Sequence, residues 1–121
     1  MARFLIVGQG LSASALADSL AREGHVVSAV AHADRGALEH VAIVCWLERS
    51  SPERFLLRSV DSSMRGFVYQ AGSYERSVSE TARLNLIPVA LLSADPLDLD
   101  VWLAQALEAV EVLLEGRRIN T

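Results

Sequence analysis

A turn of small residues near the start of the chain has the residue types and spacing needed to bind phosphate. Gly8-Gln9-Gly10-Leu11-Ser12-Ala13 fits the pattern G-x-G-x-x-G/A, with alanine at the third small position. The first glycine allows a tight turn, the second lets a pyrophosphate approach the backbone, and the third small residue lets a helix pack on a strand. Unpaired N–H groups at the start of that helix then face the phosphates. The turn predicts a dinucleotide site, unless its small residues serve packing alone.

The segments on either side of this turn are those that such a site requires. The apolar run 4–7 predicts a strand before it, and the pattern from Leu11 to Glu23 predicts a helix that ends at Gly24. Further apolar runs predict strands at 26–30, 41–47, 67–70 and 86–92. The other expected helical segments are a turn over 36–39, a helix behind a Ser51 cap with Pro52 first, a helix from a Ser73 cap to Asn85, and a helix from 95–98 to Gly116.

The alternation of these segments predicts the fold class. Apolar strands separated by helices form a parallel sheet that is covered on both faces. We therefore expect one domain over 1–121, an α/β fold with a doubly wound, five-stranded parallel sheet of Rossmann-like form and strand order 3-2-1-4-5. Pro88 lies inside the fifth run, and a proline cannot donate to a ladder on both sides. The fifth strand should therefore lie at an edge, where this order also places it.

Two stretches of the sequence resemble a known family. VGQGLSASALADSLAREGHVV, residues 7–27, resembles the opening of the NAD(P)-binding epimerase and dehydratase branch of the short-chain dehydrogenases. RGFVYQAGS, residues 65–73, is similar to that family's fourth strand, which ends in small residues beside the cofactor. The resemblance implies a cofactor across the carboxyl ends of the strands, near Ala71. It would place Cys45 and Trp46 on the adenine and ribose side, although a buried thiol and a core indole are the alternatives for these two residues.

The residues after the second strand bear on the choice of cofactor. An acid directly at the tip of that strand would bind the ribose hydroxyls of NAD, whereas an arginine nearby accommodates the 2′-phosphate of NADP. Here Asp34 reaches the ribose only if the strand runs a residue or two longer than expected, and His32 and Arg35 fit a phosphate better. The expected cofactor is NADP or NAD, with a preference for NADP. The alternative is that all three are ordinary loop residues.

The sequence departs from the family where its chemistry lies. The family pairs a tyrosine with a lysine four residues later, but Val78 stands four residues after Tyr74 and all eleven basic Lys or Arg positions are arginine. The family's substrate-binding segment also has no counterpart in these 121 residues. We therefore expect no catalysis by the usual tyrosine–lysine mechanism.

Composition and charge exclude other classes. The formal net charge is −4, and the acidic excess lies in 95–121, so no basic surface for nucleic acid or anionic lipid is expected. No apolar run approaches the roughly 18 residues that cross a membrane, and no signal peptide is apparent, so we expect a cytoplasmic protein. A single cysteine cannot form an internal disulfide, and no histidine has ligand spacing with a carboxylate, so we expect no metal site.

The last helix suggests a partner subunit. One stripe should pack on the sheet, and other apolar residues extend beyond it. The stripe is Leu99, Leu103, Ala106, Val110 and Leu113, and the additional residues are Trp102, Ala109, Val112 and Leu114. A helix this apolar around its circumference is often buried from two sides. We therefore expect a homodimer through the C-terminal helix 96–115, with a broad core face as the alternative.

Three functions fit these observations. The first is a minimal NAD(P)-binding protein that acts as a sensor, a regulatory subunit or a cofactor-binding subunit. The second is an oxidoreductase whose substrate site is completed by a dimer mate or another chain, since hydride transfer needs only the cofactor and orientation. The third is a ligand-free scaffold, because a fold does not imply a function. The intact glycine turn favours the first two, and the missing lysine favours the first over the second.

Overall fold

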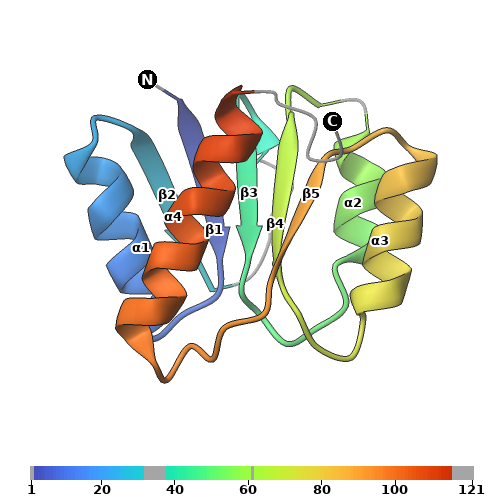
Figure 1. Ribbon diagram of the computed structural model, residues 1–121. Coiled ribbons are helices and arrows are strands. Elements are labelled where there is room, and N and C mark those ends of the chain that lie inside the picture. The colour runs from blue at the N-terminus through green and yellow to red at the C-terminus, as the bar shows by residue number, and fades with distance from the viewer. Residues whose placement is uncertain (1, 32–37, 61, 116–121) are drawn as a thin grey trace.

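A five-stranded parallel sheet forms the centre of the molecule, with helices on both faces (Figure 1). The computed structural model describes residues 2–31, 38–60 and 62–115. The strands are β1 (Arg3–Val7), β2 (Val26–Val30), β3 (Ile43–Trp46), β4 (Gly66–Gln70) and β5 (Val89–Leu92). The helices are α1 (Leu11–Arg22), α2 (Glu53–Ser59), α3 (Glu75–Leu84) and α4 (Leu99–Glu115). The predicted α/β class and the all-parallel five-stranded sheet are therefore confirmed.

The strand order differs from the prediction. The order is β2-β1-β3-β4-β5 and not 3-2-1-4-5, because β3 pairs directly with β1 on the side opposite β2. Burial explains the difference. All four side chains of β3, IVCW, are buried, whereas those of β2 are exposed or half-buried. A strand this apolar gains most from a central place, and the less apolar β2 takes the edge.

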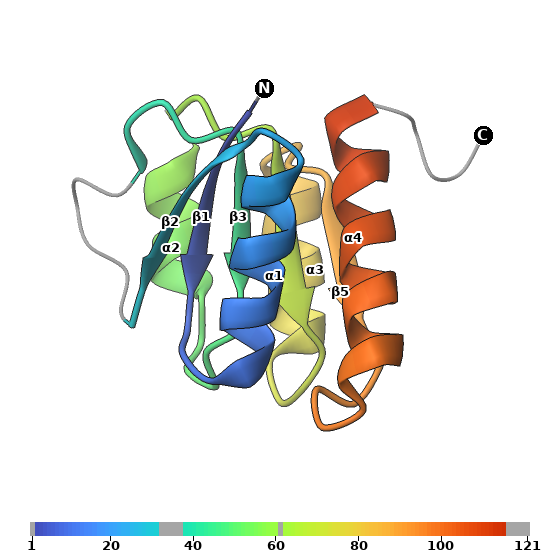
Figure 2. The same cartoon turned by 90° about the vertical axis from the view of Figure 1, so that its left-hand side faces the viewer.

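The layers follow from a change in winding after β2: β2 lies on one side of β1, and the later strands are added on the other side. The connection through α1 lies on one face of the sheet, and Figure 2 shows α1 and α4 side by side on that face. On the other face, Leu38 and Val41, which precede β3, are buried with the side chains of α2. Right-handed crossovers require opposite faces when the direction of winding changes. The carboxyl end of the sheet therefore has its switch point between β1 and β3.

The core has two halves, one on each face of the sheet. Alternate strand residues point to opposite faces, so Phe4 and Ile6 pack with α1 and α4, while Leu5 and Val7 pack with α2. Edge position is confirmed for β5, which pairs only with β4 among the described strands. This strand begins at Val89 rather than at 86 because Pro88 precedes it, and the Pro88 carbonyl accepts a hydrogen bond from Phe67 N–H.

The predicted helix starts are only partly correct. α1 begins at Leu11 as expected. Near α2, Ser51 Oγ accepts a hydrogen bond from Glu53 N–H at 3.4 Å, but Pro52 occupies the N-cap position. α3 begins at Glu75, and the predicted Ser73 cap is wrong because Tyr74 is the N-cap residue and no side chain caps the helix. Residues 36 and 37 of the expected turn, and the expected stop at Gly116, lie outside the described residues.

The buried stripe of α4 also differs from the predicted one. The buried residues are Trp102, Ala106, Val110 and Leu113. Leu99 and Leu103 are only half-buried, whereas Trp102 is fully buried and its Nε1–H donates to Gln70 Oε1. α4 is apolar over a wide arc because it packs on α1 as well as on β3, β4 and β5. Contacts within the chain thus account for the wide apolar arc of α4. A homodimer through α4 stays a prediction.

Gly66 tests how closely α4 packs on the sheet. A Cβ at this position would lie 2.8 Å from Ile43 Cδ1 and 3.1 Å from both Leu113 Cβ and Cδ1. Because Ile43 is fully buried, it has little room to move. We expect Gly66→Ala to lower the free energy of unfolding by about 1–3 kcal/mol in urea denaturation. Gly72→Ala is the control, since its nearest contact would be Gln70 O at 3.9 Å. Equal midpoints for the two variants would contradict this packing.

Candidate functional site

The first glycine of the turn is required by a close contact. Gly8 has φ 139°, and a Cβ there would lie 3.1 Å from Leu47 Cβ and 3.4 Å from Glu48 N. Its N–H donates to Val30 O at 2.8 Å. The turn is therefore held between the end of β2 and the end of β3. A side chain at this position would push the turn away from β3.

The second glycine faces open space. Gly10 has φ 109° and ψ −172°, a backbone conformation that is essentially restricted to glycine. A Cβ there would meet no atom within 4 Å. The protein's own packing therefore does not require a small residue at this position. The backbone is exposed, which leaves room for a ligand to approach it.

The start of α1 offers N–H groups to such a ligand. Gly10 is the N-cap residue, no side chain caps the helix, and the first turn holds no acidic residue. Ala13 is 3% exposed and packs in the core, as expected for the third small position, while Ser12 is half-buried. Leu11 is 82% exposed. An uncapped helix start carries a partial positive charge and favours anions.

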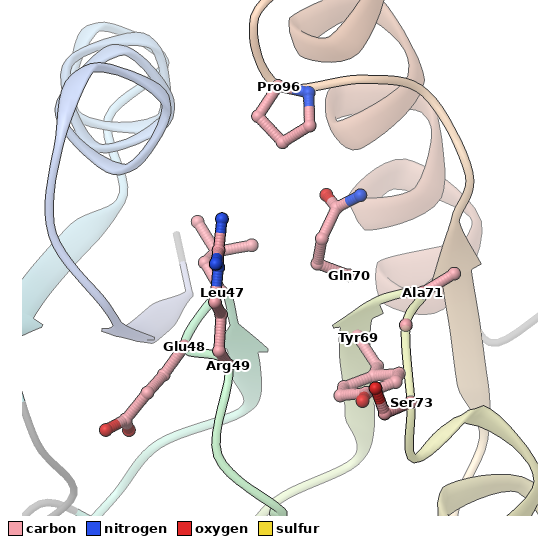
Figure 3. A pocket seen from close by; sticks show the side chains of 9 residues that line it. Leu47, Glu48, Arg49, Tyr69, Gln70, Ala71, Ser73 and Pro96 are labelled. Atoms are coloured by element: carbon pink, nitrogen blue, oxygen red, sulfur yellow. The ribbon is translucent and has the colours of Figure 1, made fainter.

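Two grooves flank the turn at the carboxyl ends of the strands. The α1–β2 groove has a volume of about 330 Å³ and lies between the first turns of α1 and the end of β2. Its lining includes Gly8, Gln9, Gly10, Ala13, Ser14, Asp18 and residues 29–31. The β3–β4 groove, shown in Figure 3, has a volume of about 420 Å³. Its lining is Leu47, Glu48, Arg49, Tyr69, Gln70, Ala71, Gly72, Ser73 and Pro96.

The turn separates these two grooves. Leu47 lines the β3–β4 groove, and the same side chain limits the space at Gly8, which lines the α1–β2 groove. Leu47 N–H also donates to Val7 O at 2.8 Å, directly before the turn. A ligand that crossed the turn at Gly10 would reach both grooves.

Most of the predicted site residues are brought together here. Gly8, Gln9, Gly10 and Ala13 line the α1–β2 groove, and Leu11 and Ser12 begin the adjacent helix. Ala71 lines the β3–β4 groove, and its N–H donates to Leu92 O at 2.8 Å. The residues expected to choose between NAD and NADP are His32, Asp34 and Arg35, which lie outside the described residues.

Cys45 and Trp46 are not part of either groove. Cys45 is fully buried on the α1 and α4 face, and burial raises the pKa of its thiol to about 12. Trp46 is 4% exposed on the opposite face, with its ring 5.2 Å from that of Phe55. The expected place on the adenine side also depended on β3 lying beyond β2, which it does not. We therefore assign both residues to the core.

Sequence analysis did not identify Arg49 and Gln70 as site residues. The side-chain amide of Gln70 forms hydrogen bonds within the protein. Its Oε1 accepts from Trp102 Nε1–H, and its Nε2 donates to Leu92 O at 3.3 Å and to Ala94 O at 3.1 Å. Arg49 is exposed at the β3–β4 groove. Its place follows from the strand order, since residues just after β3 reach the turn only if β3 lies beside β1.

The described residues contain neither a cluster of metal ligands nor the tyrosine–lysine pair of the short-chain dehydrogenases. No three His, Cys, Asp or Glu side chains among them gather as metal ligands. Tyr74 is 37% exposed, and Val78, in the position of the family's lysine, is buried. None of the helices in the described ranges has the length and apolar character for a membrane crossing.

Comparison with known proteins supports the fold alone. No family model matches the chain, and no curated protein matches it. One solved structure, described as the crystal structure of an uncharacterized protein, is similar with a TM-score of 0.57 and 16% identity. The match covers 75% of this chain and 88% of that chain. Together with the sheet topology, this likeness is consistent with a Rossmann-like α/β fold.

Burial of Cys45 predicts an unreactive thiol. Since its pKa is raised to about 12, the thiol stays protonated at pH 8, and the fully buried sulfur is also out of reach of reagents. We expect an aromatic disulfide reagent to modify the native chain far more slowly than the urea-unfolded chain. The absorbance of the released thiolate measures both rates. Equal rates in the native and unfolded chains would contradict the assignment of Cys45 to the core.

Proposed function

We propose that this protein binds NAD(P) across the turn Gly8–Gly10. The observation that carries the proposal is the backbone at Gly10: it has a conformation restricted to glycine, borders open space and begins an uncapped helix, whereas Gly24 follows the far end of that helix. A glycine at this place lets a pyrophosphate approach the backbone. The uncapped N-terminus of α1 begins at the same residue, so a pyrophosphate would find N–H donors there.

The two grooves suit the two halves of a dinucleotide. The α1–β2 groove lies beside the end of β2, on the side where a Rossmann-like fold holds adenosine. The β3–β4 groove lies on the other side of the turn, over the carboxyl ends of β3 and β4, and its Leu47 adjoins Gly8 beside the switch point between β1 and β3. Ligands of open α/β sheets bind at such switch points. A switch point beside β1 exists in both the expected and the observed strand order, because β3 occupies the place beside β1 that β4 was expected to take.

The role we propose is that of a sensor, regulatory subunit or cofactor-binding subunit. The tyrosine–lysine pair of the short-chain dehydrogenases has no equivalent in this sequence, which contains no lysine. An oxidoreductase that is completed by another chain stays an alternative, and the β3–β4 groove is where its substrate would meet the cofactor. We keep the preference for NADP over NAD and the homodimer as parts of this proposal.

The strand order favours FMN as a second candidate ligand. The order 2-1-3-4-5 is that of flavodoxin-like proteins, which hold FMN at the switch point between β1 and β3. A mononucleotide with one phosphate would need the start of α1 and only one of the two grooves. A dinucleotide would occupy both grooves, whereas FMN would occupy one, so the number of occupied grooves distinguishes the two candidates. A dinucleotide would also contact more of the surface around the turn.

Gly10→Ala tests the proposed site, and Gly24→Ala is its matched control. Both glycines have positive φ, 109° and 90°, and a Cβ at either would meet no atom within 4 Å. Each alanine should therefore lower the free energy of unfolding, by about 1–3 kcal/mol. Only Gly10 lies at the site, since Gly24 follows the far end of α1.

Isothermal titration calorimetry with NADP(H), NAD(H) and FMN measures the outcome. We expect Gly10→Ala to weaken nucleotide binding at least about tenfold, because the new methyl group occupies the approach to the backbone. Gly24→Ala should bind as the wild type does. Equal affinity of Gly10→Ala and wild type would refute the assigned site, and tighter binding of FMN than of either dinucleotide would favour the second candidate.

A further inference from the structure

The β3–β4 groove contains a single basic side chain. Among the residues that line the two grooves, all of them described, Arg49 alone is a lysine or arginine. Figure 3 shows its side chain beside Leu47, on the opposite side of the groove from Gln70 and Pro96. Arginine stays charged at every physiological pH and presents a planar set of N–H donors. The groove therefore has a permanent cation at one wall.

The backbone that carries Arg49 is held on both sides. Before it, Leu47 N–H donates to Val7 O at 2.8 Å. After it, the Ser50 carbonyl accepts a hydrogen bond from Trp46 Nε1–H at 3.0 Å. Trp46 is itself fixed by core packing against Phe55, with ring centroids 5.2 Å apart. The loop thus positions the base of the arginine side chain before any ligand binds, which reduces the entropy lost on binding.

The groove does not neutralise this cation. Glu48 is the one acidic residue in the lining, and Figure 3 shows its carboxylate pointing away from Gln70 and out of the groove. The opposite wall consists of Gln70, whose amide is bonded to the protein, and of residues 71–73, which are uncharged. Ser73 adds a hydroxyl on that wall. A guanidinium that faces neutral donors is suited to an oxygen anion.

We propose that the β3–β4 groove binds the carboxylate or phosphate of a small acidic ligand through Arg49. Two sources have this chemistry: a separate organic acid, as a substrate or signal, and a phosphate of the nucleotide itself. The groove and its cation exist without the nucleotide, so the proposal does not rest on the proposed function. If a nucleotide does bind, the acid would lie beside it at the switch point.

Inorganic phosphate is the probe, and amide NMR of the full chain in a phosphate-free buffer is the readout. We expect saturable shifts of the amides in 47–49 and 71–73. Arg49→Gln should weaken phosphate binding about tenfold, because a charge-assisted hydrogen bond is lost, and Arg49→Lys should restore part of it. The control is Arg83→Gln, an exposed arginine in the last turn of α3, which should bind phosphate as the wild type does.

A second titration, with the protein saturated by whichever nucleotide binds, separates the two sources. Phosphate that still shifts 47–49 and 71–73 indicates a site for a separate acid, and displaced phosphate indicates that Arg49 holds a phosphate of the nucleotide. Both results support an anion site at Arg49. Shifts that are absent, unchanged by Arg49→Gln, or confined to 10–13 would overturn it, and in the last case the proposed nucleotide site would still stand.

Discussion

The contact between Gly8 and the end of β3 determines the arrangement of this edge of the sheet. A side-chain carbon at Gly8 would lie 3.1 Å from Leu47 Cβ, so the turn after β1 and the loop after β3 can be neighbours only with glycine there. This contact places the start of α1 beside the switch point between β1 and β3. The exposed backbone of Gly10, the uncapped helix and both grooves then lie around one turn. The proposed ligand site follows from this one close approach.

Burial sets the order of the strands, and local sequence patterns do not reveal it. Apolar runs located all five strands, and for β2 the bounds were correct to the residue. They do not say which strands are neighbours, since pairing is a long-range property. A usable signal was present in the sequence: β2 contains the polar Ser28, whereas IVCW in β3 is apolar throughout. Comparing the two strands would have favoured an edge for β2 and a central place for β3.

The parts of the site that were predicted are those encoded within one short segment. The turn 8–13 could be predicted because its small residues stand at a fixed spacing within one segment, and Ala71 because it follows a strand end. Arg49 could not be, because its place depends on β3 lying beside β1. Cys45 and Trp46 line neither groove, and their burial agrees with the core alternative for both residues. In α4, the bond between Trp102 and Gln70 joins residues far apart in the sequence, and periodicity alone did not select Trp102 for the buried stripe.

Nucleotide binding at the turn around Gly10 is the claim on which the proposed function depends. Native mass spectrometry of the wild-type chain, alone and with NADP(H) or NAD(H) added, tests it most directly because it counts bound nucleotides and subunits together. We predict one dinucleotide for each chain, in a complex that survives transfer to the gas phase. No added mass with any of the four forms at high micromolar ligand would contradict the claim.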